Sequence, residues 1–208
     1  MAEGPVAAPD APPANLRTFL LAALIWLPTA FVAWYWSAPA VQTGAWLTAS
    51  ALRALAMDSL VSGIEVDGRL FEVVTRIPAG GNGVLTFSVD PLIYSCGMPL
   101  FAGLTLASSG NAGAIIVRLL AGLLVLVPVQ AFGVVMVILK TLAFDLAAAP
   151  GSALAWTPAA REAIALGYQL GSLVVPGVAG LMAWAALNGA FAAELAGGLG
   201  GAKPAKQA

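Results

Sequence analysis

The chain consists of long apolar stretches separated by short polar ones, and this pattern predicts a mainly helical membrane protein. The apolar stretches cover residues 16–38, 91–108, 112–145 and 161–194. A helix needs about 20 predominantly apolar residues to cross the hydrocarbon core of a bilayer. We therefore expect about four transmembrane helices.

The third and fourth stretches are longer than a simple membrane crossing. A straight helix over 112–145 would measure roughly 50 Å, whereas the hydrocarbon core is about 30 Å thick. The third helix therefore either projects from the bilayer or breaks near Pro128 and Gly133. In the fourth stretch, Pro176-Gly177 interrupts the apolar run.

A polar segment with a different periodicity lies between the first two long stretches. Residues 62–90 alternate apolar and polar positions, which is typical of half-buried strands. We expect strands at 64–67, 70–77 and 84–89, with Asp67-Gly68 as the turn of the first hairpin. The chain has nine basic and ten acidic residues. Six of them lie in this segment: Glu65, Asp67, Arg69, Glu72, Arg76 and Asp90. The segment predicts a small three-stranded β meander.

Residues 41–61, which precede the meander, predict an amphipathic helix. Apolar side chains recur there at helical spacing, and Arg53 and Asp58 interrupt the run. A three-stranded sheet is stable only when another element covers its apolar face. We expect this cover to come from the amphipathic helix or from an extension of a membrane helix.

The two ends of the chain predict flexible tails, and the basic residues predict an orientation. Residues 1–15 are rich in Pro and Ala, and residues 195–208 are rich in Gly. With four spans, Arg17, Arg118, Lys203 and Lys206 share one side of the membrane, which the positive-inside rule makes cytoplasmic. Both termini are then cytoplasmic, and the meander lies on the outer face.

Composition excludes several classes of function. The chain is 60% hydrophobic and 9% charged, against roughly 25% charged in soluble domains. Its net charge of −1 gives no reason to expect a nucleic-acid partner. It contains no histidine, the commonest general base and metal ligand, and no phosphate loop or metal-ligand cluster. We expect membrane lipid as a partner, no metal and no cofactor.

Three residues are candidates for catalysis if the chain is an enzyme. Cys96, the single cysteine, follows Pro91 at the start of a helix, where a thiolate would be stabilised. Arg118 or Lys140 would be the accompanying cation. We favour the simpler interpretation, in which Cys96 is a buried packing residue and Arg118 extends to the cytoplasmic headgroups.

Other polar residues are better candidates for binding or for structure. Gln130 should lie level with Asp90 and Pro91, where it can bond the backbone or Tyr94. Gln169 and Asn188 are isolated in the fourth stretch and predict interhelical hydrogen bonds. Our candidate binding surface contains Asp90, Tyr94, Gln130, Arg69 and Arg76.

Four stretches of the sequence resemble the exosortase H-associated membrane proteins. They are WLPTAFVAWYWSAP, EVVTRIP, VDPLIYSCGMPLFAGLTLAS and LLVLVPVQAFGVVMVILKTLAF, and the similarity covers roughly residues 16–144. These are small proteins of the bacterial inner membrane linked with an exosortase-type sorting system. The resemblance implies the inner membrane as location, a periplasmic meander and an exosortase-type membrane protein as partner.

The layout is also distantly similar to that of exosortases themselves, but the catalytic pattern differs. Exosortases carry Cys-Ser-Gly at the outer start of a membrane helix, whereas this chain has Ser95-Cys96-Gly97. The Asn-x-x-Arg element has no counterpart. The resemblance therefore favours a non-catalytic accessory protein whose meander is a recognition surface. Two alternatives are a divergent membrane cysteine transpeptidase or protease that uses Cys96, and a small transporter or channel subunit.

Overall fold

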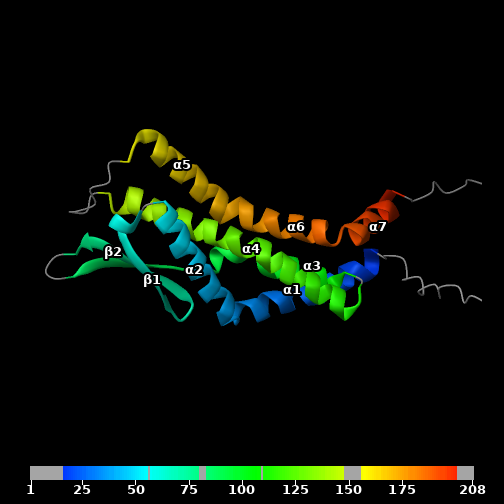
Figure 1. Ribbon diagram of the computed structural model, residues 1–208. Coiled ribbons are helices and arrows are strands. Elements are labelled where there is room, and N and C mark those ends of the chain that lie inside the picture. The colour runs from blue at the N-terminus through cyan, green and yellow to red at the C-terminus, as the bar shows by residue number, and fades with distance from the viewer. Residues whose placement is uncertain (1–15, 56, 80–82, 109, 148–155, 201–208) are drawn as a thin grey trace, which may run out of the picture.

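A computed structural model describes residues 16–55, 57–79, 83–108, 110–147 and 156–200. The predicted tail over residues 1–15 lies outside the described residues, as does the chain after residue 200. A long bundle of helices carries a small antiparallel sheet at one end, which we call the sheet end (Figure 1). The start of the first helix and the whole of the last helix lie at the opposite end, which we call the far end. The prediction of a mainly helical membrane protein with a three-stranded sheet is confirmed.

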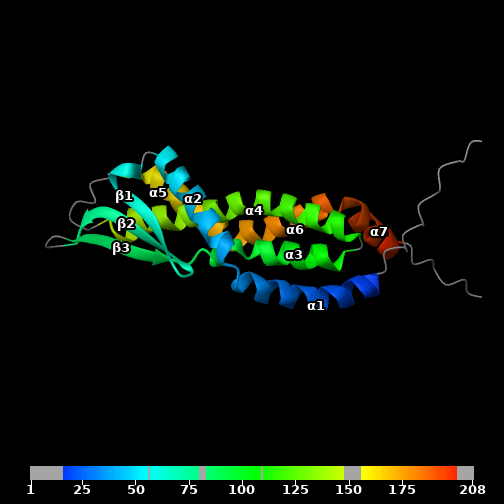
Figure 2. The same cartoon turned by 60° about the horizontal axis from the view of Figure 1, so that its bottom comes forward.

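Four helices run side by side along the bundle (Figures 1 and 2). Helices α1 (Leu16–Tyr35) and α4 (Ala112–Lys140) run towards the sheet end, whereas α3 (Gly97–Ala107) and α6 (Val175–Leu187) run away from it. Helix α4 lies at the centre and packs against α2, α3, α5 and α6.

Two helices in the described part of the chain are long and apolar enough to cross a membrane. They are Leu16–Tyr35 and Ala112–Asp145, and the bent pair Pro158–Ser172 and Val175–Leu187 makes a third if it forms one span. The apolar helix Ile93–Ala107 is shorter, because Asp90 and Pro91 begin the segment with turns. Two to three candidate spans are fewer than the four expected from the apolar stretches.

Helix α4 passes through Pro128 without ending. The α-helix continues from Ala112 to Lys140, and a π-helical turn at Thr141–Asp145 extends it. Of the two alternatives for the overlong third stretch, the structure thus shows an unbroken helix. Its last turns lie beneath the sheet, where Val134 and Ile138 are fully buried.

The sheet is a meander with the order β1-β2-β3, formed by β1 (Val61–Asp67), β2 (Leu70–Pro78) and β3 (Val84–Val89). Gly68 has φ of 60° in the β1–β2 turn, a conformation that glycine adopts without steric cost. Phe71, Val73 and Ile77 on β2 point inward and are at most 1% exposed. The opposite side of β2 remains open to solvent.

Both predicted covers contribute to the buried face of the sheet. Helix α2 (Ala38–Ala54) supplies Leu52, and α4 supplies Val134, Ile138 and their neighbours to the same hydrophobic core. Helix α2 begins three residues before the predicted amphipathic segment and ends at Ala54, before a short 3-10 turn at Met57–Ser59. Proline in its first turn suits a helix start, because the missing N–H has no partner there.

The fourth apolar stretch is bent close to the expected interruption at Pro176-Gly177. Helix α5 (Pro158–Gln169) is followed by a π-helical turn at Leu170–Val174, and the axis bends by 52° before α6. The chain breaks again at Asn188, and α7 (Gly189–Gly200) then extends into the segment predicted as a flexible tail. The bend comes just before Pro176, which stands at the start of α6 and lacks the N–H that a continuous helix would need there.

Glycines allow the helices of the bundle to approach closely. A Cβ added at Gly97 would overlap the backbone of Pro176, and one at Gly180 would overlap the backbone of Gly97. A Cβ at Gly103 would lie 2.9 Å from Cα of Leu27 on α1. Small residues at helix crossings are typical of membrane bundles, in which packing drives association.

Candidate functional site

The junction between the sheet and α3 is held by a compact set of hydrogen bonds. The Asp90 carboxylate accepts a bond of 2.9 Å from the backbone N–H of Leu92. The Pro91 carbonyl accepts bonds from the N–H of Tyr94 at 3.2 Å and from the hydroxyl of Ser95 at 3.0 Å. These bonds fix the direction in which the chain leaves β3.

Gln130 connects α4 to the same junction. Its amide Nε2 donates to the Pro91 carbonyl over 3.3 Å, and the side chain is 1% exposed. Gln130 thus bonds the backbone, which was one of its two expected partners. A Cβ at Gly44 would lie 3.1 Å from Oε1 of Gln130, so glycine lets α2 cross closely over this amide. The tight contact holds α2, α4 and the sheet junction together.

The hairpin turn of the sheet reaches the end of α1. The guanidinium of Arg69 lies over the ring of Tyr35, 4.1 Å from its centroid. This cation–π contact links the β1–β2 turn to α1. Arg76 lies seven residues further along β2, about 23 Å away at the rise of an extended strand. The structure therefore does not bring the two predicted arginines together.

The outward face of the sheet forms a polar surface, which we define by Glu65, Glu72, Arg76, Thr86 and Ser88. Glu65 pairs with Glu72 across β1 and β2, and Glu72 pairs with Ser88 across β2 and β3. All five side chains are exposed or half-exposed. Of the predicted binding residues only Arg76 belongs to this surface, because Tyr94 and Gln130 are buried. The alternation along β2 also places Glu72 outward.

The three residues proposed for catalysis lie apart. Cys96 is half-buried at the N-terminus of α3 and makes no capping hydrogen bond through its side chain. On α4, the residue at approximately the level of Cys96 is Gln130. Arg118 and Lys140 lie about 18 Å and 15 Å from Gln130 along the helix. The Lys140 ammonium forms a 2.7 Å ion pair with Asp145 and lies 6.0 Å from the ring centroid of Tyr168.

The guanidinium of Arg118 has a polar partner within the bundle, and its predicted reach to the cytoplasmic headgroups stays a prediction. Its guanidinium Nη1 donates to Oδ1 of Asn188 over 3.0 Å. The Asn188 amide donates to the Trp184 carbonyl at 3.1 Å and to the hydroxyl of Thr105 at 3.5 Å. Asn188 is only 2% exposed, so it provides the arginine with a polar partner inside the protein. Asn188 thus makes the expected interhelical bond, whereas Gln169 is exposed.

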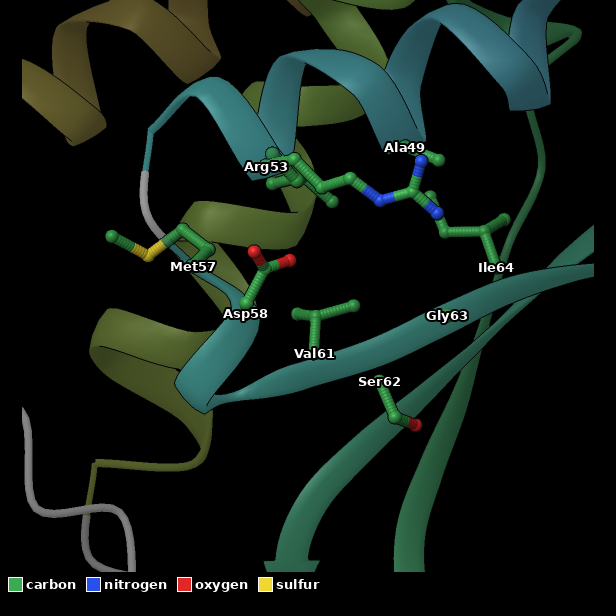
Figure 3. Close-up of a pocket in the computed structure, with 9 residues that line it drawn as sticks. Ala49, Arg53, Met57, Asp58, Val61, Ser62, Gly63 and Ile64 are labelled. Carbon is green, nitrogen blue, oxygen red and sulfur yellow. The ribbon is translucent and has the colours of Figure 1, made fainter.

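A small cleft lies between the end of α2 and the start of β1 (Figure 3). Arg53 and Asp58 line it together with Val61, Gly63 and Ile64. Its volume of about 20 Å³ is enough for roughly one water molecule. The cleft is therefore too small for a substrate. In the described ranges, no three His, Cys, Asp or Glu residues gather as a metal site would require.

Comparison with known proteins identifies the family. The family described as exosortase H-associated membrane protein matches residues 13–191, and no curated protein and no solved structure matches the chain. The match extends beyond the four stretches that carry the resemblance, and it includes the sheet, α4 and the Arg118–Asn188 pair. The chain belongs to the exosortase H-associated membrane proteins.

Proposed function

We propose that the protein is a non-catalytic accessory component of an exosortase-type protein-sorting system in the bacterial inner membrane. The outward face of its sheet recognises the exosortase or its substrate. The observation that carries this proposal is a polar, exposed sheet surface built on a buried apolar face. Such a surface is held in a fixed place above the membrane helices, which suits a docking site.

Three contacts restrict the position of this surface relative to the bundle. Gln130 bonds the junction after β3, Arg69 covers Tyr35 at the end of α1, and the last turns of α4 fill the sheet core. A binding surface on rigid elements loses less conformational freedom when a partner binds. This rigidity favours recognition by a preformed surface.

The arrangement of the helices supports the proposed orientation. The start of α1 and the whole of α7 lie at the far end (Figure 1). Arg118 bonds Asn188, which directly precedes α7. Basic residues are enriched on the cytoplasmic side of membrane proteins. We place the far end in the cytoplasm and the sheet in the periplasm.

The alternative of a cysteine transpeptidase requires a cation or a base beside Cys96. Arg118 bonds Asn188, and Lys140 pairs with Asp145. We therefore expect Cys96→Ser to retain full sorting activity in cells. Loss of sorting with normal protein levels in this variant would favour catalysis by the thiol.

Co-purification from a mild detergent tests the accessory role. The exosortase encoded in the same cells should co-purify with the tagged wild-type protein. Charge reversal by Glu72→Lys or Arg76→Glu should reduce recovery about tenfold, because one lost charge pair at an interface costs about 1.4 kcal/mol or more. Glu194→Lys is the matched control, because Glu194 is an exposed glutamate on α7. Absence of the exosortase from the wild-type preparation would contradict the proposal.

A further inference from the structure

A large apolar groove lies where α1, α2 and the middle of α4 meet. Its volume is about 710 Å³, within the range of roughly 300 to 1,000 Å³ that is usual for small-molecule sites. Trp34 and Ser37 line it from the end of α1, Thr43 and Trp46 from α2, and Leu120 and Leu124 from α4. The groove is separate from the outward face of the sheet and from the Arg118–Asn188 pair.

Polar and apolar side chains are sorted along the groove. Ser37 lies in the connection between α1 and α2, and Thr43 lies in α2 next to Gly44, which contacts Gln130 on α4. Leu120 and Leu124 lie ten and six residues before Gln130, or about 15 Å and 9 Å further into the bundle. The two hydroxyls that line the groove therefore lie near the level of the sheet junction, and its leucines on α4 extend towards the middle of the bundle.

The groove walls face the bilayer. Leu124 is 78% exposed, Trp46 is 68% exposed and Leu120 is 63% exposed. Side chains of this size on a membrane helix are in contact either with lipid or with another protein. The groove can therefore be entered sideways from the hydrocarbon core.

The composition of the groove distinguishes an acyl chain from a partner helix. Glycines mark close approaches within this bundle, as at Gly97, Gly103 and Gly122, because small residues let helices approach closely. Among the described residues that line the groove there is no glycine and no alanine, and most of them are Trp, Leu, Met and Val. A flexible hydrocarbon chain can fill such an irregular apolar space without a flat crossing surface.

The polar end can also interact with the glycerol-ester region of a lipid. The hydroxyl of Ser37 donates to the Trp34 carbonyl at 2.8 Å, which leaves its oxygen able to accept a further hydrogen bond. The indole N–H of Trp34 has no hydrogen-bond partner and is covered by neighbouring side chains. A buried indole N–H usually has a hydrogen-bond partner, so this donor is one that an ester carbonyl could satisfy.

We propose that this groove is a lipid site, which holds one acyl chain of a membrane phospholipid with its ester region beside Ser37 and Thr43. The bound lipid fills the space between α1, α2 and α4 and supports the position of α2 beneath the sheet. This site does not depend on the proposed recognition of an exosortase.

Native mass spectrometry of the full chain after extensive exchange into detergent tests the site. The wild-type protein should retain one phospholipid. Leu123 also lines the groove from α4, so Leu123→Trp fills the groove and should reduce the lipid-bound fraction at least tenfold. Val117→Trp is the control, because Val117 is 65% exposed on the same helix and does not line the groove. Trp46→Ala removes part of the wall without filling the groove and should also reduce retention.

Several outcomes would overturn the lipid site. They are a wild-type protein without bound lipid, equal retention in Leu123→Trp and Val117→Trp, and groove variants that keep the lipid but lose co-purified exosortase. The last outcome would assign the groove to a partner helix. Thermal unfolding of each variant identifies any general loss of folding. If Leu123→Trp does not fold, lipid retention by Trp46→Ala tests the site in its place. Failure of the recognition proposal would instead appear in Glu72→Lys and Arg76→Glu.

Discussion

The two halves of α4 have similar apolar sequences but opposite surroundings. Towards the sheet end, Val134 and Ile138 are fully buried in a core shared with α2 and β2. Towards the far end, Leu120 and Leu124 are more than 60% exposed on the bundle surface. Hydropathy alone thus identifies a membrane helix, whereas burial distinguishes the half that supports the sheet from the half that faces lipid.

Substitution of one apolar residue in each half of α4 should give the largest difference in the loss of stability. Ile138→Ala leaves a cavity beneath the sheet and should lower the free energy of unfolding by about 2–5 kcal/mol. Leu124→Ala removes an exposed side chain, and its effect should stay below about 0.5 kcal/mol. Thermal unfolding of both variants in the same detergent measures the difference, and equal losses would show that the two halves do not differ.

A pair of glycine substitutions tests whether close packing is confined to particular helix crossings. Gly97→Ala forces α3 away from the backbone of α6 and should cost about 1–3 kcal/mol of stability. Gly177→Ala meets no atom within 4 Å, and alanine favours a helix over glycine. Denaturation should therefore show a loss for the first variant and no loss for the second. A stable Gly97→Ala protein would contradict the packing described for α3 and α6.

The polar pair at the far end should contribute less than the core at the sheet end. Arg118→Leu removes the partner of the buried Asn188 carbonyl and should cost about 0.5–2 kcal/mol. Asn188→Leu removes the other partner, and the double variant should lose less than the sum of the two single losses. A double-mutant cycle by thermal unfolding measures this coupling. Strictly additive losses would mean that the two side chains do not interact.

The smallest effect is expected at the turn that joins the sheet to α1. Arg69→Ala loses the contact with the ring of Tyr35, which at an exposed site is worth about 0.5–1 kcal/mol. Arg69→Lys keeps the charge and should lose less. Hydrogen exchange of the β1–β2 turn reports the change locally, and unaltered exchange in Arg69→Ala would exclude Arg69 as a tie between sheet and bundle.

The pattern of the sequence predicted the sheet more accurately than the bundle. Period-two alternation and Asp67-Gly68 locate β2 and β3 to within one residue. Strand β1 begins three residues earlier than expected, because the bulge between Val61 and Gly63 interrupts the alternation. Patterns among neighbouring residues thus predicted the strands well, because strand and turn formation depends on residues that are close in the sequence.

The features that were missed depend on residues that are far apart in the chain. Arg118 and Asn188 are 70 positions apart, so only the folded bundle reveals their hydrogen bond. The bend at Leu170–Val174 coincides with the close contact between Gly171 and Gly133 on α4, which periodicity along one helix does not show. Ser88 on β3 joins Glu72 on β2 in the polar surface through the register of the two strands, which neither strand shows by itself.

Site-specific photo-crosslinking in cells tests the central claim, that the outward face of the sheet is the recognition surface. A photo-crosslinking amino acid replaces Ser88 on β3 in one variant and the lipid-facing Leu124 on α4 in another. We predict a crosslinked product with the exosortase or its sorted substrate from position 88 and none from position 124. Crosslinking to these partners from position 124 but not from position 88 would contradict the account.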